Sequence, residues 1–218
     1  MTLTLRPALS KRPDSRFHRA LFKLSRSLPL AGFQARAFLP DAEDRMRITA
    51  QLAAAIQLLS RHAPIRLAAL QRDLPRILVG PTHHLAECIY ASSMCLLQFE
   101  YVADPKTSPL KLAMTLVHEG THARLLRAGF PYEERLRRRV ERLCVLSEII
   151  FARRVPDSDA DVSSAVGRLD RSDQYWSNAS FDKFTFDALR QMGFLGRVSY
   201  YPVRLLVWLR NLMRKRAA

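Results

Sequence analysis

One segment of the sequence carries a complete set of helix start and stop signals, and it constrains the fold more than any other. Ser108 is a favourable N-cap, and Pro109 fits the first helical position because its missing N–H is not needed there. Gly129 suits the position just past a helix, and Pro131 cannot continue one. The sequence therefore predicts a helix from residue 109 to about residue 128.

A second helix is expected directly after this stop. Glu133 and Glu134 would lie in its first turn, where acidic side chains interact favourably with the helix dipole. The helix should end at Arg153-Arg154, because Pro156 restricts the backbone before it. Residues 109–154 are thus predicted to form an antiparallel helical hairpin with a very short turn.

The rest of the chain predicts an α+β fold that is mostly helical, with the hairpin beside a small sheet and helical extensions at both ends. Acidic residues at 41–44 open an apolar-periodic helix that runs to about residue 61. The remaining expectations are short helices within 1–40 (one over 17–28), a strand at 76–79, an edge strand at 98–102, a long loop at 157–180 and a last helical region at 181–213.

The net charge of +15 is concentrated at the two ends of the chain. We therefore expect a basic N-terminal arm over residues 1–40, a central domain over 41–196 and a basic C-terminal helix over 197–218. Cationic ends suit nucleic acid, an anionic membrane surface or an acidic partner, and equally a solvated arginine-rich surface. The C-terminal helix is expected either to dock on the protein or to lie in a membrane interface.

The three cysteines, Cys88, Cys95 and Cys144, lie in apolar runs without a Cys-x-x-Cys pair. This pattern predicts buried free thiols rather than a disulfide framework, and a reducing compartment. No run of residues is long and apolar enough for a spanning helix, and the N-terminus lacks a secretory signal. We therefore expect a cytoplasmic protein, with a peripheral position at a membrane as the alternative.

The first helix of the hairpin contains His118-Glu119-Gly120-Thr121-His122. Residues four apart share a face of a helix, so His118 and His122 can bind one zinc ion from the same side. Glu119 can then reach a water on that ion and act as general base and acid. At these residues the chain resembles the zincin metallopeptidases, apart from Arg124, where such motifs usually carry a hydrophobic residue.

A catalytic zinc ion usually has three protein ligands, so a third must come from another segment. No histidine follows His122, which leaves upstream histidines or downstream glutamates. Reflecting the two histidines across the short turn places Glu141 level with them on the facing helix. The other candidates fit less well: Glu133 and Glu134 lie too near the turn and Glu148 too far along the axis, while His62, His83 and His84 lie upstream.

The spacing of His118, His122 and Glu141 is similar to that of the gluzincin group of zincins, over residues 108–154. The Gly-Ala-Met-Glu-Asn signature of the aminopeptidases in that group is absent. Glu148 shares a stripe with Glu141, where it would support a ligand histidine, line a substrate pocket or pair with a surface arginine.

The resemblance also implies a substrate-binding edge strand, assigned to residues 98–102, and an oxyanion stabiliser. Candidates for the stabiliser are His83, His84, Tyr175, Tyr200 and Tyr201. We therefore expect a zinc-dependent hydrolase of the peptidase class, acting on a peptide or protein. The alternatives are a nucleic-acid-associated protease similar to SprT-like proteins, and a non-catalytic metal-binding or membrane-peripheral interaction protein.

Overall fold

The computed structural model describes residues 15–38, 40–82 and 84–180. The chain divides into two compact units, residues 1–171 and residues 172–218. The first unit contains one mixed β-sheet and a larger number of helical residues, which confirms the predicted α+β, mostly helical fold. The described part of the second unit contains the 3-10 turn η2 (Asp173–Trp176).

The sheet of the first unit has five short strands in the order β1-β2-β3-β5-β4. The pairs β2–β3 and β3–β5 are parallel, whereas β1 and β4 join the two edges as antiparallel strands. The edges are therefore β1 and β4, and β5 is an interior strand. The strands are β1 (Arg26–Leu28), β2 (Gln34–Ala37), β3 (Arg76–Gly80), β4 (Ala86–Ile89) and β5 (Met94–Gln98).

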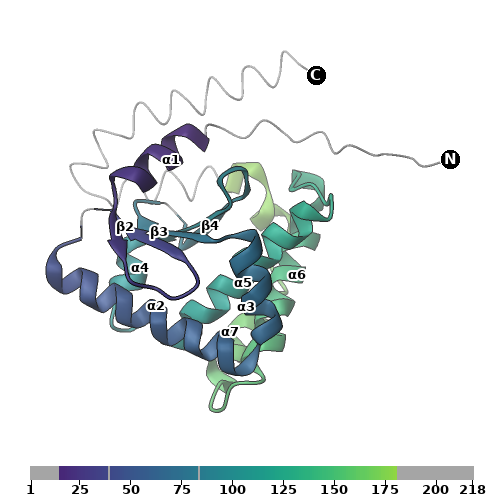
Figure 1. The fold of residues 1–218 in the computed structure, drawn as a ribbon. Coiled ribbons are helices and arrows are strands. Elements are labelled where there is room, and N and C mark those ends of the chain that lie inside the picture. Colours follow the sequence, from purple (N-terminus) through teal and green to yellow (C-terminus); the bar gives the residue numbers. More distant parts are fainter. Residues whose placement is uncertain (1–14, 39, 83, 181–218) are drawn as a thin grey trace. The chain divides into compact units, whose positions relative to one another are not determined.

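Among the described helices, α1 lies on one face of this sheet and the larger helices lie on the other (Figure 1). The predicted helix from 41 to about 61 and the strand at 76–79 are confirmed as α2 and β3. The helices are α1 (Ser15–Leu24), α2 (Ala42–His62), α3 (Pro64–Asp73), α4 (Phe99–Ala103), α5 (Pro109–Arg127), α6 (Glu134–Ala152) and α7 (Asp159–Val166), with the 3-10 turn η1 (Tyr90–Ser92).

Alternating side chains of the central strands supply both sides of the core. In β3, Ile77 and Val79 point into the larger apolar cluster, which α2, α5 and α6 also line. Leu78 points the other way and packs in a smaller cluster with Leu21 of α1. All three β3 side chains are fully buried, as expected for a strand covered on both faces.

The predicted helical hairpin is confirmed, together with its caps. The Ser108 hydroxyl accepts a hydrogen bond from the Lys111 amide at 3.1 Å and so caps α5. At the other end Gly129 has φ +84°, a conformation that favours glycine, and its amide donates to the Leu126 carbonyl. The helices α5 and α6 then pack side by side, which places their facing residues in contact.

Three local predictions are wrong. Residues 98–102 are not an edge strand, because β5 ends at Gln98 and residues Phe99–Ala103 form α4, which packs against α2. The segment 157–180 is not one loop, because α7 begins with two aspartates in its first turn. The helix expected over 17–28 ends at Leu24, and β1 and β2 follow in the N-terminal forty residues.

Several expectations concern residues outside the described part of the chain. The last helical region, 181–213, and the basic C-terminal helix, 197–218, both lie there, as do residues 1–14 of the basic N-terminal arm. Among the helices that the structure does describe, none is long and apolar enough to cross a membrane.

Candidate metal centre

The two histidines of the motif lie on the same face of α5. Their Nε2 atoms are 3.1 Å apart, and the ring centroids are separated by 4.9 Å. His122 is buried and the side chain of His118 is 15% exposed, so both imidazoles are largely removed from water. The four-residue spacing in α5 therefore brings two potential donor atoms to one point, as the sequence predicts.

Glu141 of α6 faces this pair from the opposite helix. Its carboxylate oxygens lie 3.2 Å from Nε2 of His118 and 3.4 Å from Nε2 of His122. The side chain is only 6% exposed. The position predicted from the short turn and the antiparallel helices is confirmed, and Glu141 is a candidate third metal ligand.

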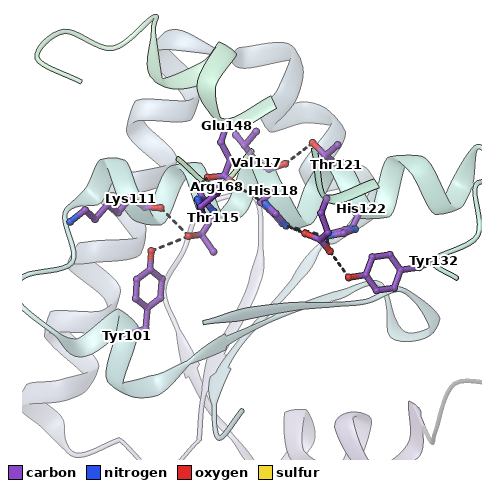
Figure 2. A network of polar contacts seen from close by, with 11 residues as sticks. Tyr101, Lys111, Thr115, Val117, His118, Thr121, His122, Tyr132, Glu148 and Arg168 are labelled. Atoms are coloured by element: carbon purple, nitrogen blue, oxygen red, sulfur yellow. Dashed lines mark hydrogen bonds and ion pairs between the residues drawn. The ribbon is translucent and has the colours of Figure 1, made fainter. Parts of the chain in front are cut away.

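Glu148, two turns further along α6, lies on the other side of His118. Its Oε1 is 2.5 Å from Nδ1 of His118, and its Oε2 pairs with Arg168 from the segment after α7 (Figure 2). A carboxylate at Nδ1 favours a proton on that nitrogen, so Nε2, which faces Glu141 and His122, is the nitrogen that could bind a metal ion after losing its proton. Of the three roles considered for Glu148, support of His118 agrees best with this buried geometry.

The charges of this cluster stabilise one another in the absence of a metal. Burial by itself would lower the pKa of His118, but the hydrogen bonds to Glu141 and Glu148 raise it well above the ordinary value. Burial would raise the pKa of Glu141, but the two imidazoles lower it well below the ordinary value. An imidazolium and a carboxylate therefore occupy the position that a cation would take.

Glu119 follows His118 in α5 and is also buried. Burial raises the pKa of its carboxyl group, the two histidines oppose the rise, and Glu141 and Glu87 add to it. The influence of Glu87 shows that the carboxyl group also senses β4, the edge strand that packs against α5. A carboxyl group with a raised pKa is suited to exchange a proton near neutral pH.

Tyr132 belongs to the site but was absent from the predicted set. It lies in the turn between α5 and α6, and its hydroxyl donates a hydrogen bond to Oε1 of Glu141. Its ring meets His122 edge to face at 5.2 Å (Figure 2). The Arg137 guanidinium lies 5.3 Å from the ring centroid. Burial and the negative charge of Glu141 raise the pKa of Tyr132, which keeps the phenol as a donor.

Cys144 is a second residue that the sequence reasoning did not assign to the site. Donor atoms of His118, His122 and Cys144 all lie within 4.8 Å of one another, a grouping that could hold a metal ion. Burial raises the pKa of the Cys144 thiol, and the neighbouring carboxylate of Glu141 adds to this rise. Without a metal the thiol therefore keeps its proton, whereas the carboxylate of Glu141 is already ionised and lies 3.2 Å and 3.4 Å from the two histidines.

The donor atoms of His118, His122 and Glu141 have the spacing that zinc requires. A tetrahedral zinc ion with bonds of about 2.0–2.1 Å holds its ligand atoms about 3.3–3.4 Å apart. The two Nε2 atoms here are 3.1 Å apart, Oε2 of Glu141 lies 3.2 Å from Nε2 of His118, and Oε1 of Glu141 lies 3.4 Å from Nε2 of His122. Two imidazoles and a carboxylate are also a donor set that zinc accepts, so the residues present fit the ion.

Of the predicted oxyanion stabilisers, the structure describes His84 and Tyr175. His84 lies before β4, where its backbone amide donates to the Thr82 hydroxyl. Tyr175 is in the second unit and stacks edge to face on Trp176. His83, Tyr200 and Tyr201 lie outside the residues that the structure describes.

The prediction that residues 98–102 form a substrate-binding strand is wrong, because Phe99–Ala103 form α4. Within the sheet, the edge beside α5 belongs to β4, and β5 is covered on both sides by its neighbours. Any extended ligand that pairs with the sheet near Glu119 would therefore meet β4.

Comparison with known proteins adds no assignment to this geometry. No family model matches the chain, and no match is found among curated proteins or among solved structures. The chemistry of the site is therefore inferred from its own donor atoms and their surroundings.

Proposed function

We propose that this chain is a zinc-dependent hydrolase that cleaves peptide bonds. The observation that carries the proposal is the convergence of His118, His122 and Glu141 at separations of 3.1–3.4 Å. The resemblance of the motif to zincin metallopeptidases gives this donor set its expected metal and reaction. Zinc bound there would supply Lewis acidity to a water molecule and to the substrate carbonyl.

The residues around the donors have roles that suit this chemistry. Glu148, held by Arg168, directs the Nδ1 proton of His118 and keeps Nε2 available as a donor. Tyr132 fixes the Glu141 carboxylate through its hydroxyl. Both contacts orient side chains before any ligand arrives, which reduces the reorganisation that binding would require.

Glu119 is the proposed general base and acid. Its carboxylate would accept a proton from the attacking water and return it to the amine that leaves. The raised pKa supports this role, because a carboxyl group with an ordinary pKa is a weaker base at neutral pH. Its position between the histidines and β4 suits a substrate bound at the sheet edge.

The proposed substrate is an extended peptide segment that pairs with β4. Among the described strands, β4 has one neighbour in the sheet, β5, so we propose that its outer edge accepts the substrate as a further strand. Residues 86–89 also pack near α5, which would bring a paired backbone close to the proposed metal centre.

The proposal is tested with a peptide-library cleavage screen of the full-length protein and its Glu119→Gln variant. We expect wild type to cleave a subset of peptides, and Glu119→Gln to keep its zinc while turnover falls by about 10²–10⁴-fold. The matched control is Glu100→Gln, an exposed glutamate of α4, which should retain both properties. Equal cleavage by wild type and Glu119→Gln would contradict the proposal.

A further inference from the structure

Cys144 differs from the other two cysteines in what surrounds it. Cys88 and Cys95 face each other across β4 and β5 and belong to the larger apolar cluster. Cys144 is 0% exposed, yet among the described residues it belongs to neither apolar cluster. A buried cysteine usually acts as a small apolar side chain, and this one is instead surrounded by groups of the proposed metal centre.

Its place on α6 explains this environment. Cys144 lies three residues after Glu141 and four before Glu148, so the three side chains share one face of the helix. That face meets His118 and His122 of α5 through the contacts that both glutamates make. The Cys144 sulfur is therefore held beside the donors by the same helix packing that positions Glu141.

The distances bring the sulfur into the range of a shared ion. One donor atom each from His118, His122 and Cys144 lies within 4.8 Å of the other two. A zinc–sulfur bond of about 2.3 Å is longer than a zinc–nitrogen bond, so a sulfur donor can stand further from the histidines than a carboxylate oxygen does. Thiolate is also among the strongest protein ligands for zinc.

We propose that Cys144 is a fourth metal donor, which closes the coordination position that the hydrolase would need for water. This inference rests on the proposed function and adds a form of regulation to it, because a metal ion with four protein ligands has no open position until water or substrate displaces one of them. The thiol loses its proton to the buffer as the sulfur–metal bond forms, so no oxidant or reductant takes part. Activity then requires the sulfur to leave the metal.

The test uses Co²⁺ as a probe in the full-length protein after removal of bound metal with a chelator. Co²⁺ gives weak visible bands from any four-coordinate site and an intense near-ultraviolet charge-transfer band only when a thiolate is bound. We expect one equivalent or less to produce both signals in wild type. Cys144→Ala should lose the near-ultraviolet band and keep the visible bands, and the matched control Cys95→Ala should keep both.

A double variant covers the case in which Cys144→Ala does not fold. In Cys88→Ala/Cys95→Ala, Cys144 is the sole remaining thiol, because the chain has three cysteines, and the near-ultraviolet band should persist. The inference would be overturned if wild type gave the visible bands without the charge-transfer band. It would also be overturned if the charge-transfer band persisted in Cys144→Ala. These results leave Glu119-dependent cleavage intact, whereas absence of every Co²⁺ signal would overturn the proposed function as well.

Discussion

Asp73 and Glu141 are two of the buried carboxylates that contact α5, and they differ in the basic side chains that pair with them. The Asp73 side chain, at the end of α3, is 4% exposed and pairs with Arg72 at 2.9 Å and with Arg127 at 2.8 Å. The Glu141 side chain is 6% exposed and pairs with His118 and His122. Burial is therefore nearly equal, and only the partners distinguish the two clusters.

The difference in partners separates a structural cluster from a chemical one. A guanidinium stays charged at every accessible pH, so the Asp73 cluster has one state and serves to hold α3 against α5. An imidazole can release its proton near neutral pH and then offer a lone pair to a metal ion. Similar buried carboxylates on the same helix can thus stabilise the fold or form a binding site.

The largest expected effect is on zinc affinity, which should respond to a mutation in the Glu141 cluster and not to one in the Asp73 cluster. Glu141→Ala should cause the largest loss of zinc affinity, because it removes a donor that lies against both histidines. Asp73→Ala should keep zinc affinity unchanged and lower the free energy of unfolding by about 1–3 kcal/mol, since it breaks the arginine pairs. Zinc titration and denaturant unfolding of both variants measure these effects. Loss of zinc affinity in Asp73→Ala would remove the distinction.

A smaller loss of zinc affinity is expected when Glu148, which contacts Nδ1 of His118, is mutated. Glu148→Gln keeps the shape of the side chain but removes the charge that pairs with Arg168 and accepts from Nδ1. We expect zinc affinity to fall by about 10–100-fold, as for other groups that orient a metal ligand. Arg168→Met should cause a smaller loss, because it acts through Glu148. Competition with a chromogenic chelator measures both values, and unchanged affinity in Glu148→Gln would show that this carboxylate has no supporting role.

The smallest expected effect is on how the stability of the metal-free protein depends on pH. The raised pKa of His118 means that its contribution to stability is complete below its ordinary pKa of 6.5 and is lost as pH rises through the raised value. The lowered pKa of Glu141 means that its contribution is present above its ordinary pKa of 4.5 and is lost as pH falls through the lowered value.

The metal-free protein should therefore have a melting temperature that declines on the alkaline side, above pH 6.5. Excess zinc should reverse this trend, since the ion binds the deprotonated imidazoles. Thermal unfolding with and without zinc gives the comparison, and Glu141→Gln serves as the control in which the slope is reduced. A melting temperature that rises with pH in the metal-free protein would be inconsistent with the pairing of His118 and Glu141.

The hairpin and three of its facing residues could be predicted because their causes are local. Ser108, Pro109 and Gly129 fix the ends of α5, and a short turn then determines which residue of α6 faces His118 and His122. Glu148 could be placed on the same stripe for the same reason. In these cases spacing along a helix is enough to give proximity in space.

The remaining parts depend on contacts between distant segments. Aromatic and polar residues alternate over 98–102, which is compatible with a strand or with one turn of helix, and packing on α2 selects α4. Arg168 reaches Glu148 from twenty residues further along the chain, and no local pattern predicts that contact. The position of Tyr132 in the short turn between α5 and α6 was a weak sequence signal that its side chain lies near the facing residues of the hairpin.

Zinc analysis of the purified full-length protein and its Glu141→Ala variant tests the central claim most directly. We predict about one zinc ion per wild-type chain, as for a site with one convergent donor set, and a clearly lower zinc content in Glu141→Ala after dialysis. Wild-type protein without bound zinc after exposure to the ion, or equal zinc content in the two proteins, would contradict the claim that His118, His122 and Glu141 form a metal centre.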